Sequence, residues 1–354
     1  MPEIKLPITR YYGSKRKLVQ KIWDALIEQG LEFNSVLDIF GGTGSFSYFA
    51  KKQNKEVIYN DIFNFNHHIG RKLIEQSSNN LTIGEAINLL SPQQGILYRR
   101  TITDNFDGIY FTHEENEQID IFVQNANLLE DENKRLSAYY ILYQSCIIKR
   151  PYNLFHRNNL SMRTNYSGGG FGNKITWERT FEELFERFIN ELDEVTFDNG
   201  RNNSAVNFSA LNCPHTADLV YIDPPYFSTS RSHTTYHAKY HFLEGLANYD
   251  EIEQNIDFAK NNREIVINKS SEFEKPQFFL EQLSQLIRQH EDSIIAISYR
   301  NKGIPEIDEI AETVRACRPN NRVEVIDLGL YGYALNKSNS SNNEFLIIAT
   351  NDII

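Results

Sequence analysis

A short apolar segment that runs directly into a glycine-rich turn constrains the fold more than any other feature. Residues 35–40 read Ser-Val-Leu-Asp-Ile-Phe, glycines follow at 41, 42 and 44, and a helix is expected from about Ser45. A second apolar segment, 57–59, precedes an expected helix at 64–74. Strand and helix thus alternate as in a doubly wound, parallel α/β fold.

The rest of the chain separates into an interruption and a return of strands. Residues 79–195 have helical periodicity at 117–128, 134–148 and 176–192 but few strand-like segments. Further apolar segments predict strands that complete the open sheet, at 219–222, 264–267, 294–298, 323–327 and 345–349. Helices are expected near 14–27, with Ser14 as the N-cap, and near 250–260, 277–289 and 307–316. We therefore predict a catalytic domain of residues 1–78 and 196–354, interrupted by a mainly helical insertion at 79–195.

Composition limits the classes of protein that the chain could be. Its 354 residues are 40% hydrophobic and 23% charged, as in a globular protein, and no apolar run approaches the ~20 residues of a membrane span. The three cysteines (Cys146, Cys213 and Cys317) are too scattered for a disulfide framework or a zinc site. This pattern favours a cytoplasmic protein without a metal.

The charge distribution leaves room for a nucleic acid partner. The net charge of -11 argues weakly against a polyanion, but residues 149–177 contain five Lys or Arg and no acid. A locally basic face on an acidic protein is compatible with DNA. The aromatic residues in this stretch, including Tyr152 and Phe155, could stack on displaced bases, whereas a solvated basic loop is the simpler interpretation.

The glycine turn and its flanking acids indicate a nucleoside cofactor. Backbone N–H groups at a helix N-terminus let a ligand approach closely, and Asp38 before the turn favours a ligand with an amino group. The methionine end of S-adenosylmethionine meets this requirement, although a structural turn or a dinucleotide site would have similar glycines. Asp61, about twenty residues past the turn, could reach ribose hydroxyls or could simply cap a helix.

A second motif follows the buried segment 219–222 and reads Asp223-Pro224-Pro225-Tyr226. The Asp223 carboxylate and the Pro224 carbonyl can accept hydrogen bonds from an exocyclic amine, and Tyr226 can stack on a flat ring. Two prolines after a strand are also a common terminator. Methyl transfer to a nucleobase amine uses all four residues.

Together these motifs resemble those of the adenine-N6-specific DNA methyltransferases, alpha group, of the restriction–modification type. Phe40-Gly41-Gly42-Thr43-Gly44 is similar to the family's cofactor loop, and Asp223–Tyr226 matches its catalytic motif. Tyr12-Gly13-Ser14-Lys15 is similar to the N-terminal motif that touches the cofactor's methionine carboxylate. The resemblance covers most of the chain. It implies a class I S-adenosylmethionine-dependent methyltransferase fold, with a Rossmann-like open sheet and an inserted target-recognition subdomain.

The chain departs from the family pattern at one place. Asn207-Phe208 stands where the family often has Asp-Phe, and an Asn oxygen can accept the same bond from the cofactor's adenine. The expected catalytic residues are Asp223, Pro224, Pro225 and Tyr226. The expected cofactor-binding residues are Tyr11, Tyr12, Lys15, Asp38, Phe40, Gly42, Gly44, Asp61, Asn207 and Phe208. The expected DNA-binding residues are Lys149, Arg150, Arg157, Arg163, Lys174, Arg231 and Lys239.

The resemblance implies methyl transfer from S-adenosylmethionine to N6 of an adenine flipped out of double-stranded DNA, with a companion restriction endonuclease as a further partner and no membrane. Cytosine-N4 methyltransferases use a near-identical site, more often with Ser in place of Asp223. RNA or protein-glutamine methyltransferases more usually have Asn there. A catalytically silent DNA-binding subunit would not need the intact motif, and a nicotinamide-dependent oxidoreductase would leave it unexplained.

Overall fold

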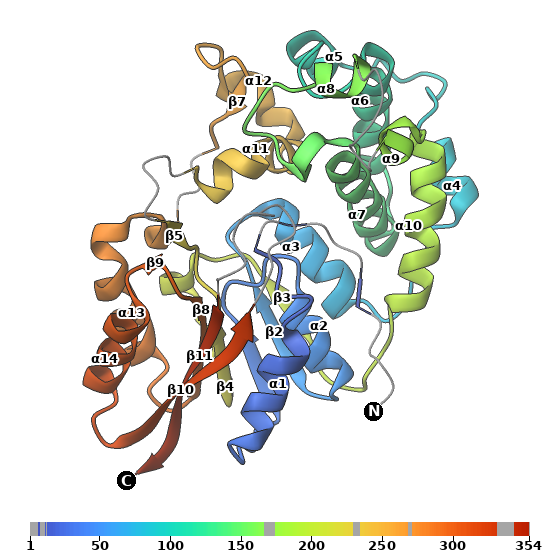
Figure 1. Cartoon of the computed structure of the whole chain (residues 1–354). Helices are drawn as coiled ribbons and strands as arrows, with labels where there is room; N and C mark the ends of the chain where they lie inside the picture. The colour runs from blue at the N-terminus through green and yellow to red at the C-terminus, as the bar shows by residue number, and fades with distance from the viewer. Residues whose placement is uncertain are drawn as a thin grey trace.

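A seven-stranded sheet forms the lower half of the molecule (Figure 1). The computed structural model describes residues 6–7, 11, 13–165, 174–228, 234–267, 271–330 and 343–353. The strands are β1 Ser35–Asp38, β2 Glu56–Asn60, β3 Ser204–Val206, β4 Leu219–Ile222, β8 Ile294–Arg300, β10 Asn321–Leu330 and β11 Asn343–Ile353. Their order across the sheet is β10-β11-β8-β4-β1-β2-β3.

The sheet is mostly parallel, and its strand order reverses at β1. Strands β8, β4, β1, β2 and β3 pair in parallel, whereas β11 is antiparallel to both of its neighbours. The chain moves outward from β1 to β2 on one side and to β4 on the other. In such sheets the crevice outside the carboxyl ends of the two central strands is the usual ligand site.

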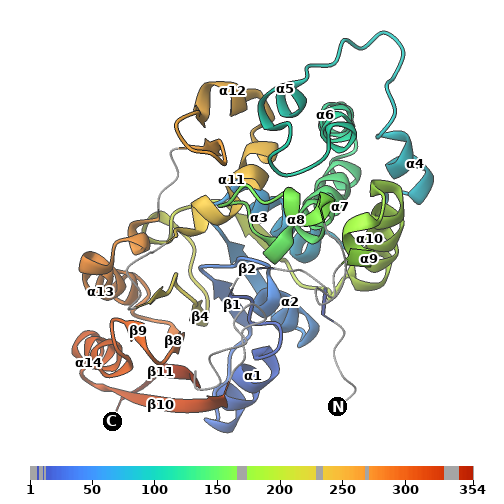
Figure 2. The ribbon, with the colours of Figure 1, turned by 45° about the horizontal axis from the view of Figure 1, so that its top comes forward.

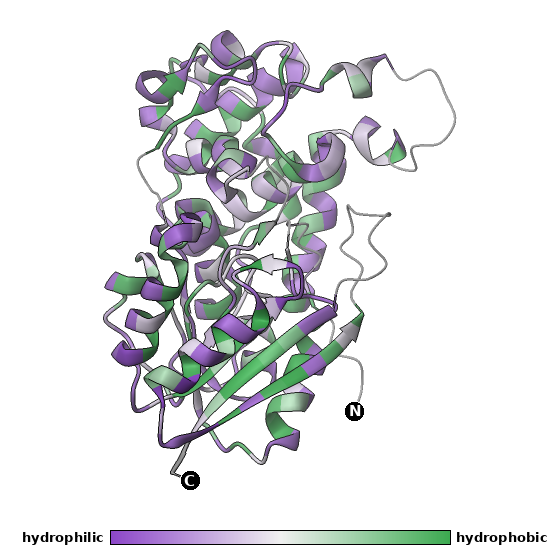
Figure 3. Cartoon of the chain, turned by 60° about the vertical axis from the view of Figure 1, so that its left-hand side comes forward, coloured by the Kyte–Doolittle hydropathy of each residue, from purple (hydrophilic) through white to green (hydrophobic). Residues whose placement is uncertain are grey.

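Side chains of each central strand point alternately to two helical layers. Val36 of β1 packs in the larger apolar cluster with α1 and α2, and the next residue, Leu37, packs in a second cluster with α13 and α14. The strands are therefore buried on both faces, as in other parallel sheets. These flanking helices are α1 Val19–Glu28, α2 Ser45–Lys52, α3 Asn64–Gly70, α13 Phe279–Gln289 and α14 Ile307–Cys317. Figure 3 shows hydrophilic and hydrophobic residues mixed along the helices that it displays.

A mainly helical layer lies above the sheet (Figures 1 and 2). It contains α4 Ile83–Asn88, α5 Thr101–Phe106, α6 His113–Asn127, α7 Glu132–Lys149, α8 Ser161–Thr164, α9 Lys174–Glu178 and α10 Phe181–Val195. Thr112 and Thr180 begin α6 and α10 with capping boxes. The later elements α11 Tyr236–Ala247, α12 Ile252–Asn255, β6 Ile256–Asp257 and β7 Glu264–Ile265 lie in the same layer. Phe242 of α11 packs on Phe106 and Tyr110, with ring centroids 5.3 and 5.2 Å apart.

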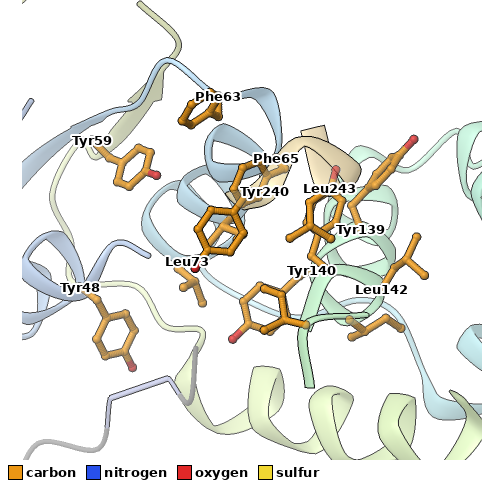
Figure 4. Close-up of a cluster of buried hydrophobic side chains, with 14 of the residues drawn as sticks. Tyr48, Tyr59, Phe63, Phe65, Leu73, Tyr139, Tyr140, Leu142, Tyr240 and Leu243 are labelled. Carbon is orange, nitrogen blue, oxygen red and sulfur yellow. The ribbon is translucent and has the colours of Figure 1, made fainter. Parts of the chain in front are cut away.

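The two layers share one apolar core. Around α3, α7 and α11, the rings of Phe65, Tyr240 and Tyr140 lie between the sheet layer and the helical layer (Figure 4). The centroids of Phe65 and Tyr240 are 5.7 Å apart. Tyr59 of β2 belongs to the same cluster, so packing in the helical layer is continuous with packing beneath the glycine turn.

The remaining elements are short. They are the strands β5 Phe227–Ser228 and β9 Gly303–Ile304, the π-helical turn η1 Arg71–Glu75, and 3-10 turns at η2 Pro151–Asn153, η3 Ala210–Asn212, η4 Tyr249–Glu251, η5 Glu272–Glu274 and η6 Pro276–Phe278. In the described part of the chain, no helix is both long enough and apolar enough to cross a membrane.

The fold confirms the predicted α/β class, with four corrections. The strand expected at 264–267 is β7, which pairs with β6 in a separate hairpin and does not join the main sheet. Strand β3 takes the edge position and was not predicted. Ser14 does not cap the first helix, since α1 begins at Val19 after Leu18, without a side-chain cap. The helix expected at 250–260 is reduced to the short α12.

Candidate active site

A cavity opens where the strand order reverses. Its walls come from the carboxyl ends of β1, β2 and β4 and from α11. The expected site residues that line it are Tyr11, Lys15, Asp38, Phe40, Gly42, Asp61, Phe208, Asp223 and Pro225. The position is the one that an open α/β sheet offers to a ligand.

The glycine turn has a backbone that requires glycine. Gly42 and Gly44 have φ of 51° and 69°, in the left-handed region that other residues avoid. Asp61 holds the turn, because its carboxylate accepts hydrogen bonds from the Gly42 N–H at 2.9 Å and from the Phe63 N–H at 2.8 Å. The carboxyl end of β2 is thereby tied to the loop that follows β1.

Asp38 lines this cavity and has a buried carboxylate. Its side chain is 1% exposed; Oδ2 accepts a hydrogen bond from the Ser47 hydroxyl at 2.7 Å, but Oδ1 is buried without a partner in the described part of the chain. Burial raises the pKa of Asp38 to about 7, although the Ser47 hydrogen bond opposes the shift. A buried acceptor without a donor is unfavourable, so the site fits a ligand that brings one, such as an amino group.

Asp223 belongs to a buried charge cluster. The Lys15 ammonium lies 3.1 Å from Asp223 Oδ1 and 2.6 Å from Glu344 Oε1. The Tyr226 hydroxyl lies 2.5 Å from Asp223 Oδ1 and 3.1 Å from Glu344 Oε1, and Lys15 also contacts it. The Ser298 hydroxyl donates to Glu344 at 2.9 Å. One cation therefore lies between two carboxylates.

Burial and charge shift the pKa values in this cluster. Burial raises the pKa of Asp223 to about 7, Lys15 opposes the shift, and Glu344 adds to it. For Lys15, burial alone would lower the pKa, but Asp223 and Glu344 outweigh burial and raise it above its ordinary value. Lys15 thus stays protonated, while Asp223 changes its charge near neutral pH.

Aromatic rings form much of the remaining wall. Tyr11 stacks on Tyr240 with centroids 4.4 Å apart and an interplanar angle of 4°, and it lies 5.9 Å from Tyr236. Phe40 packs edge-on against Phe273 at 5.1 Å. Phe208 lines the cavity and remains 39% exposed, so its ring can contact a ligand.

Several expected residues have positions different from those that the motifs suggested. The Asn207 amide donates to the carbonyls of Asp61 and Ile62 at 2.7 and 3.0 Å, and this residue does not line the cavity. Lys15 directs its ammonium to the Asp223 cluster. Tyr226 packs edge-on against Tyr299 with centroids 5.2 Å apart and does not line the cavity. Gly44 and Pro224 adjoin wall residues, whereas Tyr12 and Arg231 lie outside the described residues.

Three of the expected DNA-binding residues make internal contacts. Lys149 and Arg163 both pair with Glu115 of α6, at 2.8 and 2.7 Å, and are almost fully buried. Arg150 is 1% exposed, and its guanidinium donates to the carbonyls of Tyr110, Leu154 and Arg157. The stretch contains no acid in sequence, but Glu115 from another helix neutralises part of it in space.

The other expected DNA-binding residues are divided between surface and interior. Arg157 and Lys174 are exposed. Lys239 is buried, with its ammonium 2.7 Å from the Thr234 carbonyl and 4.6 Å from the centroid of the Tyr236 ring. Arg157 and Lys174 are therefore the exposed members of the expected set in the described residues, whereas Lys149, Arg150 and Arg163 make internal contacts.

The structure adds residues to the site that the motifs did not single out. Tyr236, Ser271 and Glu274 line the cavity, and Glu274 accepts a hydrogen bond from the Tyr236 N–H at 3.1 Å. Glu344 is fully buried at the start of an apolar strand. An acid in such a strand was the one signal in the sequence that could have identified it, because a buried charge requires a partner.

Comparison with known proteins agrees with this geometry. The model of the D12 class N6 adenine-specific DNA methyltransferase family matches residues 11–295, which is most of the chain. Type II methyltransferase M2.HphI of Haemophilus parahaemolyticus is 28% identical over 311 residues, covering 84% of this chain and 89% of that protein. Type II methyltransferase M.NlaIII of Neisseria lactamica is 24% identical over 317 residues, covering 85% and 86%.

A longer relative matches over only part of its length. Modification methylase LlaI of Lactococcus lactis subsp. lactis is 26% identical over 337 residues, covering 93% of this chain but 52% of that protein.

The extent of the family match, together with the cavity at the strand reversal, identifies the family of the chain. It belongs to the D12 class of N6 adenine-specific DNA methyltransferases.

Proposed function

We propose that the cavity binds S-adenosylmethionine beside a flipped adenine and that Asp223 orients the adenine amine for methylation. Asp38 would accept the cofactor's amino group, Asp61 its ribose, and Phe208 would lie against its adenine. One observation carries the proposal: Asp38, which has a buried oxygen without a partner in the described part of the chain, and Asp223 line the same cavity from the adjacent strands β1 and β4. A donor and an acceptor of a methyl group would thus lie side by side.

The residues of the chain would act by positioning and electrostatics. The cofactor, when bound, supplies an electrophilic methyl group on a sulfonium. The Asp223 carboxylate and the Pro224 carbonyl accept hydrogen bonds from N6, so the nitrogen lone pair turns towards that methyl group. In this structure the Tyr226 hydroxyl donates a hydrogen bond to Asp223 Oδ1 at 2.5 Å. We infer that the incoming amine displaces this hydroxyl and that the ring of Tyr226 then stacks on the base.

We propose that DNA binds over the loop that follows α7. Tyr152 is 46% exposed in a left-handed conformation with φ of 61°, and Arg157 is exposed in the same loop. The Phe155 N–H donates to the Lys239 carbonyl at 2.9 Å, which joins this loop to α11 and so to the cavity wall. The recognition region would then contain residues 234–267 in addition to 79–195. A phosphate contact suits Arg157, and base stacking suits Tyr152.

The first test is the substitution Asp223→Ala. Nucleoside mass spectrometry of DNA incubated with the variant and S-adenosylmethionine should find no N6-methyladenine, while calorimetry should find cofactor binding within a few-fold of that of the wild type. Asp24→Ala on the exposed face of α1 is the matched control and should methylate normally. Methylation by Asp223→Ala at the wild-type rate would refute the assigned role.

We further propose that a companion restriction endonuclease cleaves the same DNA sequence. This proposal draws on the printed names of the relatives, which are type II methyltransferases and modification methylases. Long-read sequencing of DNA from cells that express the protein should give the methylated sequence. An endonuclease encoded beside this protein should then cut that sequence only when it is unmethylated.

A further inference from the structure

Glu344 has the features of a functional residue but belongs to neither the glycine turn nor the Asp223–Tyr226 motif. It lies near the start of β11, the one antiparallel strand among the described strands of the sheet, and it is fully buried. Its Oε1 accepts hydrogen bonds from the Lys15 ammonium at 2.6 Å, the Ser298 hydroxyl at 2.9 Å and the Tyr226 hydroxyl at 3.1 Å. A buried carboxylate without a positively charged partner would strongly destabilise the fold.

The charge balance around Asp223 depends on Glu344. Lys15 alone would neutralise Asp223, since its ammonium is 3.1 Å from Oδ1 and only 3% exposed. With Glu344 the cluster has two carboxyl groups and one ammonium, so it carries one net negative charge when both carboxyl groups are ionised. The other titratable or charged groups around the cluster are Asp38 on β1, Tyr221 on β4, and Tyr299 and Arg300 on β8.

The proposed reaction needs that negative charge. The N6 lone pair forms a bond to the methyl carbon as the bond from carbon to sulfur breaks, so positive charge moves from sulfur to N6. N6 then loses a proton to water, and the neutral methylamine remains. A carboxylate beside N6 stabilises the developing positive charge, whereas an unbalanced ammonium at the position of Lys15 would oppose it.

Glu344 also provides a second acceptor for the Tyr226 hydroxyl. When an amine takes Asp223 Oδ1, the Tyr226 hydroxyl must leave a buried site or find another acceptor. Glu344 Oε1 is 3.1 Å away, so the hydroxyl can transfer its hydrogen bond without entering water. The exchange would leave no buried donor unpaired.

We propose that Glu344 is a positioning residue for methyl transfer, which holds Lys15 and offsets its charge so that the target amine meets a cluster without excess positive charge. This inference rests on the proposed role of Asp223. Glu344, the second residue of β11, would thus affect catalysis through Lys15 and Tyr226.

The test is Glu344→Gln, which keeps the shape and an acceptor oxygen but removes the charge. We expect kcat to fall about tenfold, less than for a group that touches the reacting atoms. The acid limb of kcat/KM for DNA should move to lower pH, because the repulsion that raises the pKa of Asp223 is lost. Glu344→Asp keeps the charge and should retain a midpoint close to that of the wild type.

Glu191→Gln is the matched control, because Glu191 is another buried carboxylate that accepts a hydrogen bond from a tyrosine, Tyr140, at 2.7 Å. Its acid limb should not move. A wild-type pH profile in Glu344→Gln would overturn the inference while leaving the role of Asp223 intact. If Glu344→Gln does not fold, a wild-type acid limb near pH 4, the range of an ordinary Asp, would overturn the inference equally.

Discussion

Gly41→Ala tests how the glycine turn is held above the core. Gly41 does not have a positive φ, so the backbone itself tolerates alanine. A Cβ at this position would lie 2.5 Å from both Cδ2 and Cζ of Tyr59 and closer still to Cε2. Carbon atoms prefer a separation of about 3.5–4.0 Å, so the ring would have to retreat by about 1 Å.

The ring of Tyr59 has no room to retreat. On its far side Gly70 approaches so closely that a Cβ there would lie 2.9 Å from Cγ, and closer to Cδ1 and Cε1. Overpacking of this kind destabilises by about 1–3 kcal/mol. The Tyr59 hydroxyl also donates to the carbonyls of Gly42 and Asn66 at 2.6 and 3.1 Å, and strained bonds there add about 1 kcal/mol. We expect a loss of about 2–4 kcal/mol.

Urea denaturation measures the free energy of unfolding, and calorimetry measures cofactor affinity. Because the displaced ring moves the Gly42 carbonyl, the cofactor Kd of Gly41→Ala should rise at least tenfold, about 1.4 kcal/mol. Gly84→Ala is the control: its Cβ would meet nothing within 4 Å in α4, so stability should be unchanged or rise by up to about 1 kcal/mol. If Gly41→Ala were as stable as the wild type and bound the cofactor equally well, the reasoning would be wrong.

Three further predictions concern the cavity and its surroundings. Burial raises the pKa of Asp223 to about 7, so its carboxylate is protonated as the pH falls through that value. Below this pH, kcat/KM should fall about tenfold for each pH unit. A flat pH profile of kcat/KM from pH 5.5 to 7.5 would contradict this prediction. Phe208→Ala should change unfolding free energy by less than about 0.5 kcal/mol, as Phe208 is 39% exposed, yet raise the cofactor Kd several-fold by calorimetry. Arg150→Ala should lose about 3–5 kcal/mol of stability in urea, whereas Arg157→Ala should keep its stability and reduce the salt dependence of DNA binding by about one charge.

The sequence predicted the centre of the fold better than its edges. Segment 219–222 was predicted with its correct bounds, because a strand buried on both faces reads as a continuous apolar run. Strand β3 is a three-residue edge strand, Ser-Ala-Val, and too short to show a period. The strand signal at 264–267 corresponds to a real strand, but the period of a strand does not specify its partner, and β7 pairs with β6 outside the sheet.

Short sequence motifs also predicted part of the chemistry of the site. Asp38, Gly42 and Asp223 each lie at or just after a strand end and line the cavity, so short-range sequence identified these three groups. The reversal of strand order then brings them together, and this arrangement follows from the α/β alternation that the sequence already indicated.

The charge partners were decided by the tertiary structure alone. Lys15 reaches Asp223 and Glu344 from a distant part of the chain, and Glu115 neutralises Lys149 and Arg163 inside the helical layer. Electrostatic energy depends on separation in space and on burial, and neither is encoded in the neighbours of a residue along the chain. The sequence by itself thus determined the fold class and the family and predicted several of the residues that line the cavity, whereas the structure decided which other residues line it and which charges they face.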